Sequence, residues 1–362
     1  MPGLSHRRRF LSFVTAVLYG ALCAGTSASR AAESPATETV PHIAVLLPLG
    51  SGPFVSHAEA VRNGFLAAAE VQGTSVLPLR IYAASDDANV ILSGYRQAIA
   101  AGARLVVGPL TRTGVSAVAA TNLIPVPTLV LNVPDGVAIP PERLFMLSLQ
   151  VESEAKLVAR LAYDEGARRV YSVAGTDALS KRMHDAFIEE FKRLGGAHAD
   201  EQIYGGDRAS LERYRAGIAA SNADAVFLAL DAERGRAVRP YLGALPVYAT
   251  SQIFPGTDAQ LAAFELADVR FVGMPWLLQP DHAAVMVYPR PAYGGDMDLQ
   301  RLYALGIDAF RIGQELAAGH TRFTLDGVTG QLVLGADHQF RRALPVAQFV
   351  DGGVTVVGQI GP

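Results

Sequence analysis

Short apolar runs alternate with amphipathic segments along most of this chain, and this alternation constrains the fold more than any other feature. Residues 43–47 (IAVLL) form a continuous aliphatic run, which is typical of a parallel strand buried on both faces. Residues 54–68 then repeat apolar side chains at spacings of three and four, as one face of a helix does. Ser56 and Glu59 have the spacing of a capping box at its start. Further strands are expected at residues 77–82, 104–107 and 127–131.

A second series of the same kind follows an apolar run at residues 145–149. Its strands are expected at residues 170–174, 198–204, 225–230, 246–249 and 269–272. The strand–helix order in both series predicts parallel sheets with helices on both faces. Residues 274–296 are rich in proline and glycine, and a helical apolar pattern resumes from Leu302 to Leu316. The tail holds short strands separated by Asp-Gly and Gly-Gly steps, which are hairpin signals.

We therefore predict an α/β fold of two doubly wound parallel-sheet lobes with C-terminal β-hairpins. The expected boundaries are 1–31 for a signal peptide, 32–41 for a linker, 42–148 for the first lobe, 149–273 for the second lobe, 274–320 for a return segment to the first lobe, and 321–362 for the hairpins.

The first forty residues predict export. Three arginines at positions 7–9 precede an apolar run at residues 10–24, and small residues follow, with Ser29 and Ala31 at the −3 and −1 positions of a cleavage point. The single cysteine, Cys23, lies inside the run, so the mature chain would hold no thiol. Lipid anchoring at Cys23 is the alternative, but Leu22 stands where lipoprotein signals carry a small residue. A periplasmic protein without an anchor is the favoured interpretation.

Composition and motifs argue against several functional classes. The net charge of −3 comes without a basic tract, which disfavours nucleic-acid binding. The eight histidines are dispersed and show no metal-ligand spacing, so no metal and no cofactor is expected. Ser153 and Lys156 fit S-x-x-K, but the S-D-N and K-T-G companions of that nucleophile motif are missing. We expect no catalytic residues and no enzyme.

Several separate segments resemble the type I periplasmic binding fold in the correct order. They are residues 43–50 (IAVLLPLG), 106–110 (VVGPL), 127–132 (PTLVLN) and the crossover strand at 145–149. A narrower resemblance, to the C-terminal domain of LpoA/LppC-type penicillin-binding-protein activators, rests on Leu131-Asn132, residues 301–310 (RLYALGIDAF), 325–330 (LDGVTG) and 341–351 (RRALPVAQFVD). That resemblance implies a non-enzymatic protein that contacts a peptidoglycan synthase and stimulates it. The other hypothesis is a solute-binding receptor of an ABC-type importer for amino acids or amides.

Polar residues that follow the strands are the candidates for a ligand cleft, because two-lobed α/β proteins bind ligands at the carboxyl ends of their strands. A hydroxyl or a free amide in one lobe suits a carboxylate, and an aspartate in the other suits an ammonium. The same residue types also cap helices in any α/β protein. The candidates are Ser51, Phe54, Thr111 and Asn132 in the first lobe, and Asp177, Asp231, Ser251 and Gln252 in the second. Trp276 could stack on a ligand, although packing under a loop is favoured.

Overall fold

Two sheets organise the part of the chain that the computed structural model describes, which is residues 39–73, 75–121, 123–136, 139–256 and 260–361. These ranges belong to one compact unit that begins at Thr39. The predicted signal peptide, Cys23 and most of the predicted linker lie outside the described residues. Within the described ranges, no helix combines the length and the hydropathy that a membrane span requires.

The first sheet is parallel, with the strand order β2-β1-β3-β4-β5. Its strands are β1 (His42–Leu47), β2 (Leu79–Ala83), β3 (Ala103–Val107), β4 (Thr128–Val130) and β5 (Leu144–Met146). The intervening helices are α1 (Val55–Gln72), α2 (Ala88–Ala100) and α3 (Arg112–Ala119). Ile43, Val45 and Leu47 of β1 join the core under α1, whereas Ala44 and Leu46 join the core under α2 and α3. This alternation is why β1 reads as an unbroken apolar run.

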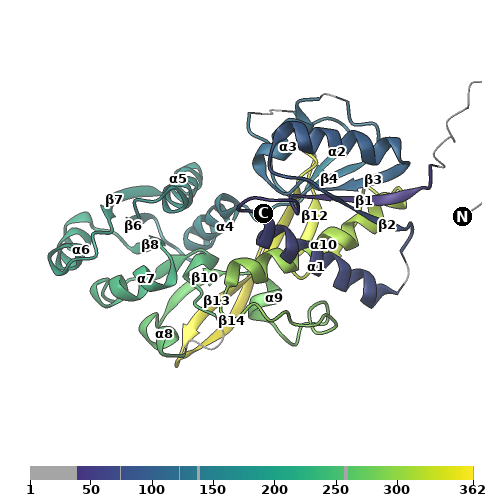
Figure 1. Ribbon diagram of the computed structural model, residues 1–362. Coiled ribbons are helices and arrows are strands. Elements are labelled where there is room, and N and C mark those ends of the chain that lie inside the picture. The colour runs from purple at the N-terminus through teal and green to yellow at the C-terminus, as the bar shows by residue number, and fades with distance from the viewer. Residues whose placement is uncertain (1–38, 74, 122, 137–138, 257–259, 362) are drawn as a thin grey trace, which may run out of the picture. The chain divides into compact units, whose positions relative to one another are not determined.

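The parallel part of the second sheet has the order β10-β9-β8-β6-β7 (Figure 1). Its strands are β6 (Arg169–Ala174), β7 (Ala197–Ile203), β8 (Ala225–Ala229), β9 (Val247–Ala249) and β10 (Val269–Val272). The helices are α4 (Val151–Asp164), α5 (Ala178–Arg193), α6 (Arg208–Ser221), α7 (Ala232–Val238) and α8 (Gln260–Glu265), with 3-10 turns η1 (Arg239–Tyr241) and η2 (Ser251–Ile253). Side chains of α4 and α5 share one buried cluster with this sheet. Tyr214 of α6 and Val238 of α7 pack in the other.

After β10 the chain forms the short helix α9 (Pro275–Leu278), an irregular excursion, and the long helix α10 (Met297–Ala317), which packs along α1. The two helices approach closely because each presents a glycine to the backbone of the other. A Cβ built on Gly64 would lie 1.9 Å from the Tyr303 carbonyl oxygen, and one on Gly306 would lie 2.0 Å from the Val61 carbonyl oxygen. Only glycine therefore fits at both positions.

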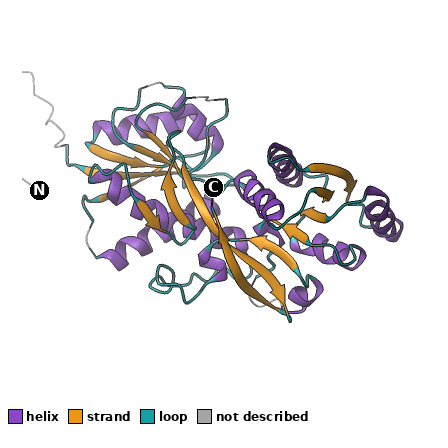
Figure 2. Cartoon of the chain, turned by 180° about the vertical axis from the view of Figure 1, so that it is seen from behind, coloured by secondary structure: helices purple, strands orange, loops and turns teal. Residues whose placement is uncertain are grey.

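The C-terminal strands are antiparallel and extend the second sheet (Figure 2). They are β11 (Thr324–Asp326), β12 (Gln331–Leu334), β13 (Phe340–Val350) and β14 (Gly353–Ile360). The first half of β13 pairs with β12, and its second half pairs with β10. The residues just before β13 also touch the first sheet, because the Met146 amide donates to the His338 carbonyl at 2.9 Å.

The fold class is as the sequence predicts, but three local expectations are wrong. The last two tail strands are longer than the short strands expected, because β13 pairs with β12 from Phe340 to Ala343 and with β14 from Leu344 to Val350, and β14 runs to Ile360. The irregular segment includes the helix α9. The capping box at Ser56 does not form: Phe54 occupies the N-cap position of α1 and makes no side-chain cap bond.

Candidate functional site

A cavity of about 400 Å3 opens at the carboxyl end of the first sheet, where the sequence predicts a ligand cleft. Phe54, Thr111 and Asn132 line it, as does Arg182 from α5 of the second lobe. Half of the remaining lining residues are leucines, and the other half are polar or charged. The leucines are Leu110, Leu131, Leu149, Leu302 and Leu305, and the polar residues are His57, Asp86, Arg112, Thr113 and Gln150. The last two leucines come from α10, so the long return helix makes one side of the cavity apolar.

The polar candidates of the first lobe are engaged in local hydrogen bonds. Thr111 is the N-cap of α3, and its Oγ1 accepts from the Gly114 amide at 3.3 Å. Asn132 donates its Nδ2 to the Leu110 carbonyl at 3.2 Å, and its Oδ1 accepts from the Val133 amide at 3.0 Å. Ser51 is exposed in the turn before α1 and does not line the cavity. The side chains of Thr111 and Asn132 therefore hold their own loops.

The two aspartates of the second lobe are paired with one arginine. Asp177 and Asp231 are the N-caps of α5 and α7, where each accepts a backbone amide at 2.9 Å. Arg234 donates its Nη1 to Asp177 Oδ2 at 2.6 Å and its Nε to Asp231 Oδ2 at 2.8 Å. The cap bond from Ser180 and the guanidinium of Arg234 hold the pKa of Asp177 well below its usual range. Neither aspartate lines the cavity.

Ser251 and Gln252 lie in the turn η2, outside the wall of this cavity. Ser251 is buried, its amide donates to Glu154 Oε2 at 3.3 Å, and its carbonyl accepts from Arg301 Nη2 at 2.9 Å. The Gln252 amide bonds Thr250 Oγ1 at 3.4 Å. The structure thus brings together three of the eight predicted residues, Phe54, Thr111 and Asn132, and places the other five elsewhere.

Arg182 is one of three charged lining residues that the sequence does not point to, together with Asp86 and Arg112. It donates Nε and Nη2 to the two carboxylate oxygens of Glu152, at 2.6 and 2.9 Å. Burial tends to raise the pKa of Glu152, but the hydrogen bonds from Arg182 lower it overall. Arg182 sits in the second turn of a helix and follows no strand directly, so no strand-end pattern could identify it.

The remaining sequence candidates do not assemble a reactive centre here. Ser153 is exposed on α4, and Lys156 pairs with Glu189 at 3.4 Å. Trp276 is fully buried at α9 and donates its Nε1 to Gln300 Oε1 at 2.9 Å. Across the described ranges, no group of three His, Cys, Asp or Glu side chains is placed to hold a metal ion.

A model of the family described as "LppC putative lipoprotein" matches residues 36–218 and 215–352. The chain belongs to the LppC family. Among curated relatives, the penicillin-binding protein activator LpoA of Photobacterium profundum is 25% identical over 351 residues, which cover 87% of this chain and 56% of that protein. The LpoA of Pantoea ananatis is 26% identical over 313 residues, which cover 72% of this chain and 45% of that protein. This LppC chain therefore spans about half the length of the curated relatives it matches.

Solved structures support the same assignment and the predicted fold. A Chromobacterium violaceum protein described as a putative branched-chain amino acid ABC transporter is 40% identical, with a TM-score of 0.73 over 85% of this chain and 99% of that one. The C-domain of Haemophilus influenzae LpoA, described as a regulator of PBP1A, is 23% identical to this chain with a TM-score of 0.73. The match covers 87% of this chain and 99% of that domain. The resemblance to LpoA/LppC proteins and to two-lobed binding folds is thus confirmed.

Proposed function

We propose that this LppC-family protein regulates peptidoglycan synthesis by binding a penicillin-binding-protein synthase through its surface, without a free amino acid as ligand. The curated relatives are named penicillin-binding protein activators, and the Haemophilus influenzae C-domain is described as a regulator of PBP1A. The observation that carries the proposal is the pairing of both candidate aspartates, Asp177 and Asp231, with Arg234.

That pairing argues against a receptor for amino acids. Such a receptor needs a carboxylate that faces the ligand's ammonium, because a buried charge requires a partner of opposite sign. Both candidate carboxylates are committed to Arg234, and they lie outside the cavity. The cavity wall holds one other carboxylate, Asp86, whose Oδ1 is buried without a hydrogen-bond partner among the described residues. A receptor would therefore have to use Asp86 in place of the two paired aspartates, beside leucines and the locally bonded Thr111 and Asn132. A surface that contacts another protein does not need a complete ligand constellation in the cleft.

We further propose a non-enzymatic protein that acts in the periplasm after cleavage near Ala31. The geometry of the S-x-x-K pair supports the absence of transpeptidase chemistry, because Lys156 is engaged with Glu189 and the exposed Ser153 side chain forms no hydrogen bond with another described residue. Mass spectrometry of the mature N-terminus decides between this form and an anchored one. A diacylated Cys23 would place the protein on a membrane leaflet.

The second candidate function is the solute receptor. It is favoured by the 40% identity to the Chromobacterium violaceum protein, which this chain matches over 99% of that protein's length. A receptor of this kind would bind its solute by closing two lobes around it. Free amino acids and their amides are the solutes to test.

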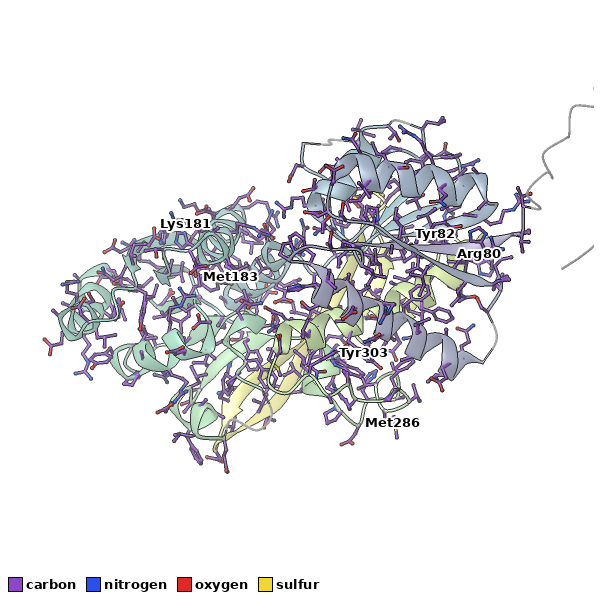
Figure 3. The ribbon with its side chains drawn as sticks, in the orientation of Figure 1. Arg80, Tyr82, Lys181, Met183, Met286 and Tyr303 are labelled. Atoms are coloured by element: carbon purple, nitrogen blue, oxygen red, sulfur yellow. The ribbon has the colours of Figure 1, made fainter. Side chains whose placement is uncertain are left out.

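The experiment is a binding assay of the mature protein with a synthase ectodomain, beside thermal unfolding with free amino acids. The proposal predicts saturable synthase binding that amino acids do not change. A ligand at 100 times its dissociation constant adds about 2.7 kcal/mol of stability, so a true solute would shift unfolding clearly. A shift with leucine that is lost in Arg182→Gln, together with no synthase binding, would support the receptor and overturn the proposal. Arg80→Gln, an exposed position on the outer strand β2 (Figure 3), is the matched control.

A further inference from the structure

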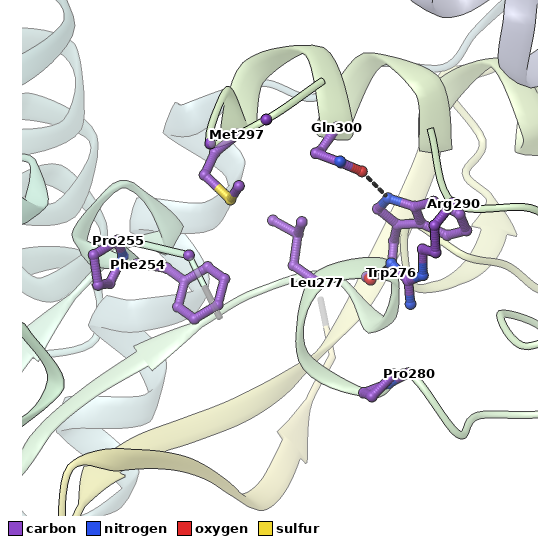
Figure 4. Close-up of a pocket in the computed structure, with 11 residues that line it drawn as sticks. Phe254, Pro255, Trp276, Leu277, Pro280, Arg290, Met297 and Gln300 are labelled. Atoms are coloured by element: carbon purple, nitrogen blue, oxygen red, sulfur yellow. Dashed lines mark hydrogen bonds between the residues drawn. The ribbon is translucent and has the colours of Figure 1, made fainter. Parts of the chain in front are cut away.

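A second cavity, of about 530 Å3, lies where η2, α9 and the start of α10 meet. Phe254 and Pro255 line one side, and Trp276 and Arg290 line the other (Figure 4). Its residues do not overlap with those of the cleft described above. The volume falls in the range of small-molecule sites, which is roughly 300–1,000 Å3.

The walls of this cavity are mainly apolar and include two aromatic side chains. Leu277 lies between the two sides, and Met297 and Gln300 border the cavity from α10 (Figure 4). The hydrogen bond from the Trp276 indole to Gln300 holds the ring in place. Such a wall suits an aliphatic or aromatic group, because burying it removes apolar surface from water.

Arg290 supplies a positive charge without an acidic partner. Its guanidinium stacks 3.9 Å from the Trp276 ring centroid, and its Nη1 donates to the Trp276 carbonyl at 2.6 Å. No carboxylate of the described residues forms an ion pair with it, and none of the lining residues is acidic. Burial lowers the pKa of Arg290, yet a guanidinium stays charged in proteins. A planar fork with free N–H groups is suited to a carboxylate.

Two backbone amides add further donors. Gly294 and Gly295 line the cavity, and neither N–H makes a hydrogen bond to any residue in the described part of the chain. A Cβ built on either glycine would meet no atom within 4 Å, so the space beside them is open. An anion bound in the cavity could use these amides as well as Arg290.

We propose that this cavity binds a carboxylate carried on an aliphatic or aromatic body, with the carboxylate at Arg290, which stacks on the buried Trp276, and the body against Phe254, Leu277 and Met297. The ligand has no free ammonium group, because none of the described residues that line the cavity is acidic. N-acylated amino acids and the C-terminal residues of peptides share this chemistry. The site goes beyond the proposed function and does not depend on it.

Trp276 makes the site directly observable, because it is the single tryptophan of the chain. The test is a titration of the mature protein with N-acetylleucine and with its amide, followed by tryptophan fluorescence and by calorimetry. The acid is expected to bind at least about tenfold more tightly than the amide, since hydrogen bonds to a charged group are worth more than 1.4 kcal/mol. Arg290→Gln should abolish this preference, and Arg80→Gln should leave it unchanged.

A second variant keeps the proposal testable if Arg290→Gln disturbs the stacked tryptophan. Met297→Glu, at the first position of α10, places a carboxylate in the wall and should weaken N-acetylleucine at least about tenfold. A leucine-terminated peptide with a free carboxyl end, compared with its amidated form, distinguishes the two ligand sources. If the peptide with a free carboxyl end binds more tightly than N-acetylleucine, the ligand is the C-terminal end of a peptide. If it binds equally or more weakly, the ligand is a free N-acylated amino acid.

Three results would overturn the proposal: no fluorescence or heat signal with any of the acids, equal affinity for acid and amide, or unchanged affinity in both variants. None of these results involves the synthase ectodomain. Failure of this site and failure of the proposed function are therefore distinguishable.

Discussion

Gly306→Ala should destabilise the protein through the contact between α1 and α10. The added methyl group would lie 2.0 Å from the Val61 carbonyl oxygen and 2.8 Å from the Phe65 amide nitrogen. Both obstacles belong to backbone, so no side-chain rotation relieves the clash. The helices must separate by about 1.4 Å to bring the 2.0 Å approach to an ordinary contact of 3.4 Å, which loosens the interdigitated core. The edge-on pair of Phe65 and Phe310, with ring centroids 5.2 Å apart, would be among the contacts that loosen.

The magnitude follows from two opposing effects. Overpacking of a well-packed core costs about 1–3 kcal/mol of stability and occasionally more. We expect a value of about 3 kcal/mol here, because the atoms that the new methyl group meets belong to the backbone and cannot rotate away. Alanine in a helix interior gains about 1 kcal/mol over glycine. We therefore expect a net loss of roughly 2 kcal/mol in the free energy of unfolding.

The matched control lies in the same helix. A Cβ on Gly313 would meet Leu105 Cδ2 at 3.4 Å and Val107 Cγ2 at 3.5 Å, which are ordinary contacts. Gly313→Ala should thus be neutral or stabilising by up to about 1 kcal/mol. Urea unfolding of both variants, followed by far-ultraviolet circular dichroism, measures the difference, which we expect to be about 2–3 kcal/mol. Equal stability of the two variants would refute the close approach of these helices.

Three further predictions concern buried charges. Two arginines hold the pKa of Glu190 at about 2, below its ordinary 4.5. The ionised Glu190 therefore stabilises the fold above pH 4.5, and this contribution is lost as the pH falls towards 2. The difference in unfolding free energy between wild type and Glu190→Gln, measured by urea titration, should shrink over that window. Asp308 is fully buried and accepts hydrogen bonds from two backbone amides and a hydroxyl. Asp308→Ala should therefore lower the free energy of unfolding by about 2–4 kcal/mol in the same assay, and Asp308→Asn should lower it less. An unchanged unfolding midpoint in Asp308→Ala would contradict this. The side chains of Arg342 and Glu154 are 4% and 6% exposed, and their charged atoms lie 3.5 Å apart. Arg342→Met alone should lower the free energy of unfolding by about 3–5 kcal/mol, because it leaves the buried Glu154 carboxylate without its partner. Adding Glu154→Gln should restore most of this stability, and a double variant no more stable than Arg342→Met would contradict the prediction.

The pairing of charges explains why the fold could be predicted further than the site. Strand-end position groups Thr111 and Asn132, which line one cavity, because the carboxyl ends of parallel strands share an edge. The same rule placed Asp177 and Asp231 at strand ends but could not reveal Arg234 between them. Asp177 and Arg234 are far apart in the chain, and their 2.6 Å contact exists only once two strand–helix units pack side by side.

Local and periodic information in the sequence determined most of the architecture. The unbroken apolar run of β1 specifies burial on both faces, and the order of strands and helices specifies parallel sheets, because each signal depends on neighbouring residues. The tertiary structure alone decided which polar groups remain free. It engaged Thr111 in a helix cap and both aspartates in caps and ion pairs, and it brought Arg182 into the cleft. In the described part of the chain, it left Arg290 without an acidic partner beside Trp276. Those outcomes depend on contacts between segments distant in sequence, and no periodicity records them.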